Sequence, residues 1–323
     1  MAINGWRLIE QVGAGGMGEV WRARHARMGV GALKLLREEL LADREARSRF
    51  RREARTLQRI DGLCAARVLD VDLEGESPYI VTEYVAGPTL RSYIARTGPI
   101  TDEGVVNAFA VGLAEALVAV HAAGVVHRDL TATNVLMAGQ GPKVVDFGIA
   151  RYVDAVQVTT TAFSIGTPGW MSPEQIRGDD VGPPSDMFCW GLLVCFAAGA
   201  RNVFGVGSPE ALLYRIVHEQ PSPPPLPSRL EQLALRALEK DPAARPTAAE
   251  VQRSIEQQLG ATTAEVLQRT WQQHSFDIRT SKRRGGAGSL WDRGRWWGRG
   301  RGQVGGTGDR RRISSPPPRA PGR

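Results

Sequence analysis

Cysteine and lysine are scarce in this chain of 323 residues. The three cysteines, Cys64, Cys189 and Cys195, form no Cys-x-x-Cys pair and no cysteine–histidine spacing that is typical of a zinc site. Their odd number and their apolar neighbours argue against a disulfide framework. The sequence therefore predicts buried, reduced thiols, as expected of a cytoplasmic protein.

Two further absences concern membranes. The first residues lack a basic start followed by an apolar stretch, so no secretion signal is expected. The run 105–126 is long and apolar but includes Asn107, Glu115 and His121, and the apolar run 190–200 has only 11 residues. About 20 apolar residues are needed to span a bilayer. Both runs are interpreted as buried helices of a large core, and no membrane span is expected.

The net charge of +7 is unevenly placed along the chain. Residues 261–323 contain 14 Lys+Arg and 4 Asp+Glu, which leaves 27 basic and 30 acidic residues in 1–260. We interpret 1–260 as the folded domain, 261–280 as a linker and 281–323 as a disordered tail rich in Arg, Gly and Pro. Three readings of the tail stay open. It binds nucleic acid or acidic surfaces through Arg and Trp, it is a solvated linker, or it results from a shifted reading frame in a G/C-rich gene.

The coarse pattern of the domain changes near residue 84. The first third predicts strands over 9–12, 19–24, 32–36, 67–72 and 79–83, with one helix over 44–60. Helical periodicity follows from residue 89, with later helices at about 184–200, 208–218, 228–239 and 247–259, separated by turns that contain proline. A β-rich part followed by a helical part predicts an α+β fold of two lobes with a cleft between them.

The residues with the clearest chemistry lie between 127 and 148. The sequence His127-Arg128-Asp129 and Asn134 is followed, twelve residues after Asn134, by Asp146-Phe147-Gly148. Short strands over 135–137 and 143–145 would set their separation. Asp129 is predicted to accept or orient the hydroxyl proton of an acceptor, which contributes about 10²–10⁴ in rate. Asn134 and Asp146 offer the oxygen ligands that Mg²⁺ prefers, and Mn²⁺ would fit them too.

A glycine-rich segment, Gly13-Ala14-Gly15-Gly16-Met17-Gly18-Glu19-Val20, lies upstream. Glycines let backbone N–H groups approach phosphates closely, although a flexible hairpin turn gives the same composition. A dinucleotide-binding motif would require a helix after the glycines. Residues 19–24 have the pattern of a strand instead, which argues against that motif.

Lys34 and Glu53 form the next candidate pair. The chain has four lysines against 37 arginines, and Lys34 lies inside the apolar strand 32–36. Its placement predicts a need for a compact ammonium group that binds the α- and β-phosphates, the alternative being a solvated lysine at a strand edge. Glu53 shares one helical face with Phe50, Leu57 and Ile60. A carboxylate in an apolar stripe requires a cation, and Lys34 is the natural partner.

Together these residues resemble the Hanks-type (eukaryotic-like) protein kinase family, in particular its bacterial serine/threonine members, over about residues 6–259. The match also includes Ser172-Pro173-Glu174, Asp186 and Arg245. The resemblance implies the bilobal protein kinase fold, with an N-lobe over about 1–84, a hinge over about 83–88 and a C-lobe over about 89–260. It implies an ATP:protein phosphotransferase that uses Mg²⁺ and acts on protein substrates.

The resemblance also implies roles for particular residues. Glu174 and Arg245 would form a buried ion pair, and Asp186 would anchor the catalytic loop. Glu83 to Val85 would be the hinge that binds adenine through its backbone, beside a small gatekeeper, Thr82. The implied ATP contacts are Gly13, Ala14, Gly15, Gly16, Met17, Gly18, Val20, Ala32, Lys34, Thr82, Glu83 and Val85.

Residues 149–171 resemble an activation segment. Arg128, next to the catalytic aspartate, is the mark in this family of regulation by phosphorylation there, and a phosphate on the segment would pair with it. The favoured sites are Thr159 and Thr161, with Thr160 and Ser164 as further candidates; a merely polar, mobile loop is the alternative. Autophosphorylation would involve self-association of the chain.

The sequence departs from the family pattern at two informative places. Thr131 occupies the position at which serine/threonine kinases usually carry a lysine that touches the transferred phosphate, although Thr167 in Gly-Thr-Pro matches the serine/threonine type. Residues 61–66 lack the usual His-Pro turn. Two functions therefore stay open: an active kinase, and a catalytically weak or silent kinase-like scaffold that signals by binding.

Overall fold

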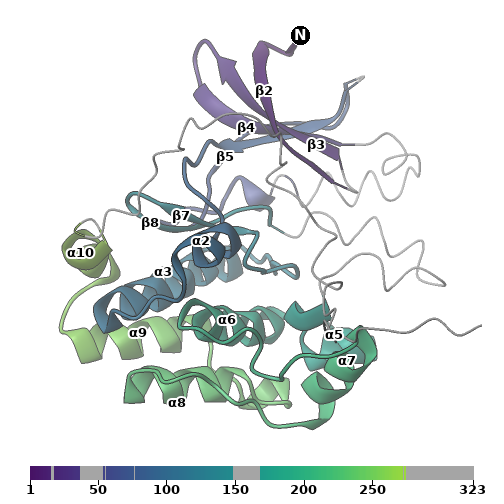
Figure 1. Cartoon of the computed structure of the whole chain (residues 1–323). Helices are drawn as coiled ribbons and strands as arrows, with labels where there is room; N and C mark the ends of the chain where they lie inside the picture. Colours follow the sequence, from purple (N-terminus) through teal and green to yellow (C-terminus); the bar gives the residue numbers. More distant parts are fainter. Residues whose placement is uncertain are drawn as a thin grey trace, which may run out of the picture. The chain divides into compact units, whose positions relative to one another are not determined.

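The computed structural model describes residues 1–15, 18–36, 54, 56–75, 77–147, 168–271 and 273. Strands come first along the chain and helices dominate after residue 89 (Figure 1). The strands are β1 (Ala2–Ile3), β2 (Trp6–Gly15), β3 (Gly18–His25), β4 (Gly29–Leu36), β5 (Val68–Asp72), β6 (Tyr79–Glu83), β7 (Val135–Ala138) and β8 (Gly141–Val144). The main helices are α2 (Leu90–Thr97), α3 (Glu103–Ala122), α5 (Pro173–Arg177), α6 (Pro183–Ala197), α7 (Pro209–His218), α8 (Ser228–Ala237), α9 (Ala248–Leu259) and α10 (Thr263–Val266). A 3₁₀ turn, η3 (Pro168–Trp170), precedes α5.

The N-terminal part is an antiparallel sheet of six strands in the order β1-β2-β3-β4-β6-β5. Its register pairs Lys34 of β4 with Val20 of β3 on one side and with Ile80 of β6 on the other. Directly paired residues share a face of a sheet, and residues two apart on a strand do as well. Lys34 therefore shares a face with Ala32, Thr82 and the apolar residues around them, and this face borders the cleft.

The opposite face of this sheet has a small apolar core of its own, which includes Trp6, Leu33 and Val81. Trp6 is fully buried, and its indole Nε1 donates a hydrogen bond of 2.8 Å to Asp70 Oδ2 on β5. Between the sheet and the rest of the fold, Ala54, Thr56 and Leu57 have helical backbone conformation. These three residues lie within the helix expected over 44–60, most of which, including Glu53, lies outside the described residues.

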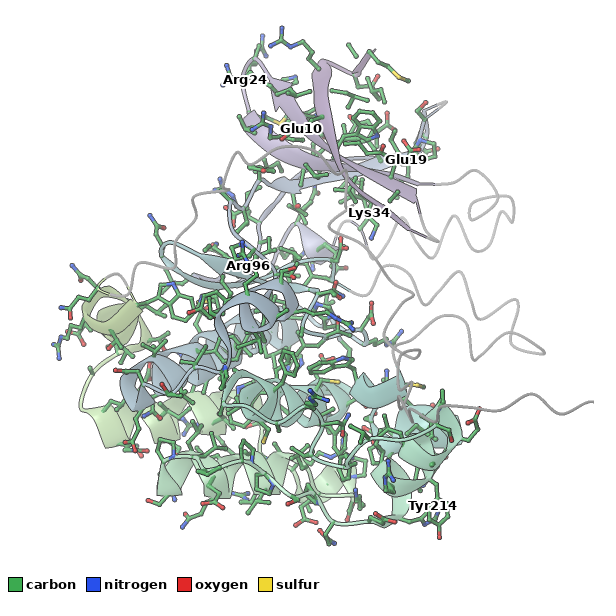
Figure 2. The ribbon with its side chains drawn as sticks, viewed as in Figure 1. Glu10, Glu19, Arg24, Lys34, Arg96 and Tyr214 are labelled. Carbon is green, nitrogen blue, oxygen red and sulfur yellow. The ribbon has the colours of Figure 1, made fainter. Side chains whose placement is uncertain are left out.

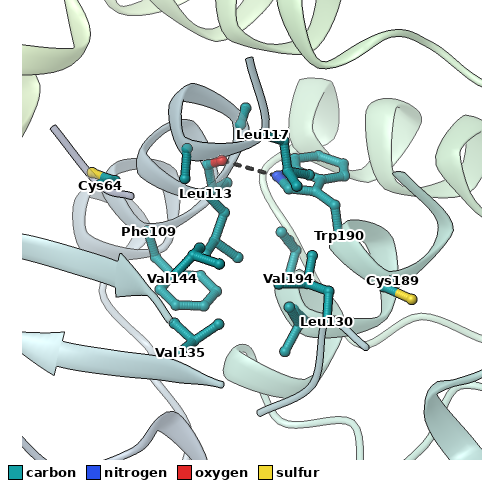
Figure 3. Close-up of a cluster of buried hydrophobic side chains, with 14 of the residues drawn as sticks. Cys64, Phe109, Leu113, Leu117, Leu130, Val135, Val144, Cys189, Trp190 and Val194 are labelled. Carbon is teal, nitrogen blue, oxygen red and sulfur yellow. Dashed lines mark hydrogen bonds between the residues drawn. The ribbon is translucent and has the colours of Figure 1, made fainter. Parts of the chain in front are cut away.

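The C-terminal part has the larger core, built around helix α3. Figure 3 shows Phe109, Leu113 and Leu117 of α3 beside Val135 and Val144 of the β7–β8 hairpin and Trp190 of α6. The Trp190 indole donates a hydrogen bond of 3.0 Å to the Ala110 carbonyl, which fixes α6 against α3. By length and apolar composition alone α3 could cross a membrane, but 72% of its apolar window is buried inside this fold. The interpretation of residues 105–126 and 190–200 as core helices is confirmed.

The three cysteines are free and buried, as the sequence predicts. The pKa of the Cys195 thiol is raised to about 12, mainly by burial and to a smaller extent by the negative charge of Glu231. Burial likewise raises the pKa values of Cys64 and Cys189 above the ordinary 9.0. All three thiols therefore stay protonated and unreactive near neutral pH.

The structured region extends beyond residue 260, in contrast to the linker expected over 261–280. Helix α9 ends at Gly260 in the left-handed conformation, and a new N-terminal capping box, Thr262 with Glu265, starts α10. A π-helical turn, Leu267–Trp271 (η5), follows it. Val266, Leu267 and Trp271 are buried. The sequence signal for this segment is the capping box followed by apolar residues. This signal covers only a few residues, so the helical pattern alone predicts an end at α9.

Lys240 gives the fold a testable pH dependence. Its Nζ donates a hydrogen bond of 2.6 Å to the Ile216 carbonyl and lies 4.0 Å from the Phe204 ring centroid. Burial, and next the charge of Arg245, lower the pKa of Lys240 from 10.5 to about 8. The folded protein therefore holds this proton less tightly than the unfolded chain. Its contribution to stability is complete above about pH 10.5 and is lost as the pH falls through about 8.

We expect the free energy of unfolding of the wild type to rise relative to Lys240→Met as the pH rises from 7.5 to 9.5. A relative gain of about 1 kcal/mol is expected, because the partial exposure of the side chain weakens the effect. Urea unfolding of both proteins across this range measures the difference, in which the titration of other groups cancels. A difference that does not change with pH would contradict the assignment.

Candidate active site

The loop that carries Asp129 is held from below by Asp186, in the first turn of α6. One carboxylate oxygen of Asp186 accepts hydrogen bonds of 2.8 Å from the His127 amide and 2.8 Å from His121 Nε2. The other oxygen accepts from the Arg128 amide at 2.9 Å. Asp186 is completely buried, so these bonds lie in a medium of low polarity. They fix the backbone at the two residues before Asp129.

Arg128 and Asp146 are non-glycine residues in the left-handed region, with φ of 64° and 59°. This conformation costs about 1–3 kcal/mol and persists only when its surroundings hold it. For Arg128 the holding contacts are visible: its amide is bonded to Asp186, and its carbonyl accepts a hydrogen bond of 2.8 Å from Gln175 Nε2 on α5. Strain of this kind is common at functional sites and is consistent with the roles predicted for both residues.

Asn134 joins the two candidate acidic residues. Its side-chain Nδ2 donates to the Asp129 backbone carbonyl at 2.7 Å and to Asp129 Oδ2 at 3.2 Å. The backbone carbonyl of Asn134 accepts a hydrogen bond of 2.9 Å from the Val145 amide. Asn134 therefore lies beside Val145, the residue before Asp146. Because the amide nitrogen is used by Asp129, the amide oxygen is the atom that Asn134 can offer to a cation.

Lys34 extends from the sheet (Figure 2), and its ammonium group meets Asp146, which follows the β7–β8 hairpin. Its Nζ lies 3.3 Å from Asp146 Oδ1, and the two side chains are 15% and 23% exposed. An ammonium and a carboxylate that meet at the edge of a cleft could bind the phosphates and the metal of one chelate. Glu53, the predicted partner of Lys34, lies outside the described residues.

The donors present suit Mg²⁺ bound together with a nucleotide. The described residues hold no cluster of three His, Cys, Asp or Glu side chains that would form a metal site without help. Mg²⁺ typically takes one or two protein oxygens and completes its coordination with water and substrate phosphates. Asn134 and Asp146 match that requirement.

A cavity lies between the sheet and the helical part, with an empty volume of about 1010 Å³ including open solvent. Seven of the predicted site residues line it: Val20, Ala32, Lys34, Thr82, Glu83, Val85 and Asp146. Sequence reasoning named Phe147 beside Asp146 but missed the other apolar walls, which include Val12, Leu57, Val68, Ile80, Leu136 and Val145. Proximity along the chain could have found Val12, Leu136 and Val145, each within two residues of a predicted site residue. An apolar slot with a few polar groups at one end suits a planar base joined to a charged chain.

The glycine-rich segment includes the end of β2 and the start of β3. Gly13, Ala14 and Gly15 lie at the end of β2 and Gly18 begins β3, whereas Gly16 and Met17 lie outside the described residues. Gly15 pairs with Gly18, and the register is irregular between Gln11 and Gly13. A strand follows the glycines, as the sequence predicts, and not a helix.

The hinge passes very close to the β7–β8 hairpin. A Cβ atom on Gly87 would lie 2.5 Å from the Met137 carbonyl oxygen, closer than any real contact of this kind. The next residue, Pro88, accepts a hydrogen bond of 2.8 Å from the Met137 amide. Glycine at position 87 is therefore required by this close approach, which sets the height of the hinge above the hairpin.

A second lysine, missed at the sequence level, ties the hinge to the same hairpin. Lys143 of β8 donates a hydrogen bond of 2.6 Å to Glu83 Oε1 and one of 3.3 Å to the Ala65 carbonyl. The side chain of Glu83 is thus bound by Lys143, and its backbone amide donates a hydrogen bond of 2.8 Å to the Arg67 carbonyl. The scarcity of lysine that singles out Lys34 applies equally to Lys143 and could have identified it.

The turn 61–66, which lacks the His-Pro of the family, is held by helix α3 instead. Both carboxylate oxygens of Glu115 accept hydrogen bonds of 2.8 Å, from the amides of Leu63 and Cys64. The Cys64 carbonyl accepts from the Val144 amide at 2.7 Å, which joins the turn to β8. The missing turn residues are therefore replaced by a long-range cap.

Glu174 and Arg245 form a buried, bidentate ion pair with N–O distances of 2.7 and 2.8 Å. Arg245 is 6% exposed and also donates to the carbonyls of Glu239, Pro184 and Lys240, so that all five of its N–H groups have acceptors. Glu174 accepts a further, short hydrogen bond from the Ser185 hydroxyl. The pair fastens α5, at the end of the predicted activation segment, to the start of α6 and the turn before α9.

Residues 6–255 match the family model of the protein kinase domain. The chain belongs to the protein kinase family. Among curated proteins, the domain is 39% identical over 249 residues to a probable serine/threonine-protein kinase PkwA of Thermomonospora curvata, a match that covers 77% of this chain and 33% of that protein. It is 36% identical over 254 residues to the serine/threonine-protein kinase AfsK of Streptomyces coelicolor, covering 78% of this chain and 32% of that protein.

A third relative, the serine/threonine-protein kinase PknA of Mycobacterium tuberculosis, is 36% identical over 249 residues, covering 74% of this chain and 58% of that protein. These matches confirm the resemblance to bacterial serine/threonine kinases and the α+β, bilobal fold expected from it. The chain spans about a third of the length of the first two relatives.

The predicted phosphorylation sites Thr159, Thr160, Thr161 and Ser164 lie outside the described residues of this kinase domain, as does Gly148.

Proposed function

We propose that this kinase domain transfers the γ-phosphate of ATP to serine or threonine hydroxyls of protein substrates. The observation that carries the proposal is the meeting of Lys34 with Asp146 across the cleft, next to an Asn134 that bonds Asp129. Lys34, a cation for phosphates, and Asp146, an oxygen ligand for a metal, line the cavity. Hydrogen bonds join the second oxygen ligand, Asn134, to the carboxylate base Asp129 and to Val145, the residue before Asp146. Phosphoryl transfer requires such positioning and charge stabilisation more than covalent chemistry.

Each residue has a separate task in the proposed reaction. The base Asp129 orients the acceptor hydroxyl and takes its proton as the oxygen bonds to the γ-phosphorus, while the bond from that phosphorus to the β-phosphate oxygen breaks and ADP leaves. Asn134 Nδ2 keeps the Asp129 carboxylate in place. Lys34 holds the α- and β-phosphates, and the hinge from Glu83 to Val85 holds the adenine. Mg²⁺, bound by Asn134 and Asp146, would neutralise the charge that develops on the phosphates.

A catalytically weak or silent scaffold is the second candidate, and Thr131 is the observation that favours it. Thr131 is 6% exposed and its hydroxyl lies 2.8 Å from that of Thr133. No ammonium group is present at this position, so the transferred phosphate receives less electrostatic stabilisation than in a kinase with lysine there. This predicts slower transfer; the other groups of the site would still support the reaction.

Incorporation of labelled phosphate from ATP into the purified chain tests the proposal. We expect incorporation that depends on Mg²⁺ and falls by about 10²–10⁴-fold in Asp129→Asn. Asp180→Asn is the matched control, because Asp180 is exposed on the loop after α5. Nucleotide binding with no incorporation in the wild type would support the scaffold instead.

Regulation and partners form the finer part of the proposal. We infer activation by autophosphorylation in 149–171, with Thr159 and Thr161 as the favoured acceptors and Arg128 as the partner of the phosphate. Mass spectrometry of the chain after incubation with MgATP identifies the residues that carry phosphate. Phosphate found only outside 149–171 would contradict this mode of activation.

A further inference from the structure

The segment 263–271, which follows helix α9, makes a specific contact with the β7–β8 hairpin. Trp271 is fully buried, and its indole Nε1 donates a hydrogen bond of 2.7 Å to the Ala138 carbonyl. Leu267, 4% exposed, lies 3.2 Å from where a Cβ atom would stand on Gly141. Ala138 and Gly141 pair with each other at the turn of the hairpin. The segment therefore binds the turn end of the hairpin through one hydrogen bond and through close packing.

The open end of the same hairpin carries the two candidate metal ligands. Asn134 directly precedes β7, and Val145 and Asp146 directly follow β8. The first pair of the ladder is Val135 with Val144, and the Val145 amide continues the bonding to the Asn134 carbonyl at 2.9 Å. Each strand has four residues, so a movement at the turn is transmitted to the ligands over a short distance. Two-stranded hairpins of this size have little stability of their own.

The segment 263–271 is itself a built element. Glu256 Oε1 on α9 accepts hydrogen bonds of 2.7 Å from both the amide and the hydroxyl of Thr263. Gln252 Nε2 donates to the same hydroxyl at 3.1 Å. At the other end of the segment, Thr270 Cγ2 lies 3.2 Å from where a Cβ would stand on Gly104 of α3. The segment is thus fixed to α9 and α3 before it reaches the hairpin.

We propose that residues 263–271 brace the β7–β8 hairpin, and that Trp271 is a positioning residue for Asn134 and Asp146. The inference rests on the proposed function, because it assigns the brace to the metal ligands of that site. Trp271 touches neither nucleotide nor metal and acts only through the Ala138 carbonyl and the ladder. A small displacement of a residue that binds the metal directly can cause a large loss of activity. Supporting contacts of this kind prevent such displacements.

Trp271→Phe in the full chain tests the brace, because phenylalanine keeps most of the burial and removes the hydrogen-bond donor. In the nucleotide-free protein we expect hydrogen exchange at the Val145 amide to become about fivefold faster. The Mg²⁺ concentration that half-saturates binding of a non-hydrolysable ATP analogue should rise about threefold or more. Neither readout requires phosphate transfer, so a failure of the proposed catalytic function leaves this test intact.

Trp6→Phe is the matched control. Trp6 is equally buried and also loses an Nε1 hydrogen bond, but its acceptor is Asp70 on β5, a strand that holds neither candidate metal ligand. We expect the control to lose thermal stability while the Mg²⁺ requirement and the exchange of Val145 stay unchanged. Equal changes in both variants would show that Trp271 contributes stability alone and would overturn the proposal, as would wild-type values in Trp271→Phe.

Leu267→Val provides a second, milder arm in case Trp271→Phe does not fold. It shortens the side chain that packs on Gly141 and leaves the indole hydrogen bond in place. A smaller shift in the same direction, in exchange at Val145 and in the Mg²⁺ requirement, is the expected result. An unchanged Mg²⁺ requirement in a folded Leu267→Val protein whose hairpin exchanges faster would refute transmission to the ligands.

Discussion

Asp146→Asn is expected to lower the rate of phosphate transfer by about 10²–10³-fold or more, because the site loses the carboxylate proposed to bind Mg²⁺. The neutral amide also removes the charge that faces Lys34 Nζ at 3.3 Å. Initial rates of transfer from labelled ATP, measured over a range of Mg²⁺ concentrations, provide the comparison. A partial rescue at high Mg²⁺ would locate the defect in metal binding.

Lys34→Met should give a loss of similar size through the phosphates. Because Lys34 and Asp146 act on one chelate, the double variant is expected to be little worse than either single variant. Asp180→Asn serves again as the exposed control, and thermal unfolding checks that each variant is folded. Undiminished transfer in Asp146→Asn would remove that residue from the mechanism.

Arg245→Leu is expected to lower the free energy of unfolding by about 3–5 kcal/mol, because it leaves the Glu174 carboxylate buried without its cation. Such a loss is a large part of the 5–15 kcal/mol that typically stabilises a domain. The three backbone carbonyls that Arg245 binds would lose their donor as well. Urea unfolding followed by circular dichroism measures the change.

Two comparisons make this second result specific. Arg236→Leu, at an exposed position of α8, should change stability by less than about 0.5 kcal/mol. The double variant Glu174→Met with Arg245→Leu should recover part of the loss, because no unpaired charge remains buried. A double variant that is less stable than Arg245→Leu alone would mean that the surroundings, and not the charge, set the cost.

The same pair predicts an acid limit. Burial alone would raise the pKa of Glu174, but the hydrogen bonds from Arg245 and Ser185 outweigh it and hold the pKa below the ordinary 4.5. The folded state therefore binds this proton more weakly than the unfolded chain does. The stabilisation is present above about pH 4.5 and is lost as the pH falls through the lowered value.

The residue pattern alone predicted parts of the site whose residues lie close along the chain, and the resemblance to the family added distant contacts such as the pair of Glu174 and Arg245. Asp129, Asn134 and Asp146 fall within one loop and one hairpin, and the apolar run around Lys34 correctly indicates a strand, β4. Helix ends marked by serine, threonine and proline were also predictable: Ser208 caps α7 and Thr247 caps α9. Local patterns of this kind carry their own physical cause in a few neighbouring residues.

What the sequence did not reveal depends on partners that are far apart. Lys143 and Glu83 are separated by 60 positions, and Trp271 and Ala138 by 133. The cap that Glu115 places on residues 63 and 64 spans about 50 positions. No periodicity links such residues, because their contact is decided by how the elements pack. The resemblance to the family supplied none of these contacts: residues 61–66 depart from the family pattern, and Trp271 lies beyond the matched residues 6–255.

The lysines finally suggest how this kinase domain would respond to chemical modification of its amines. In the part of the chain that the structure describes, each lysine has an occupied Nζ: Lys34 meets Asp146, Lys143 meets Glu83, and Lys240 meets the Ile216 carbonyl. Acylation of any one of them would abolish its positive charge and place a bulky group at a packed contact. Such a modification would therefore inactivate or loosen the protein instead of merely decorating its surface.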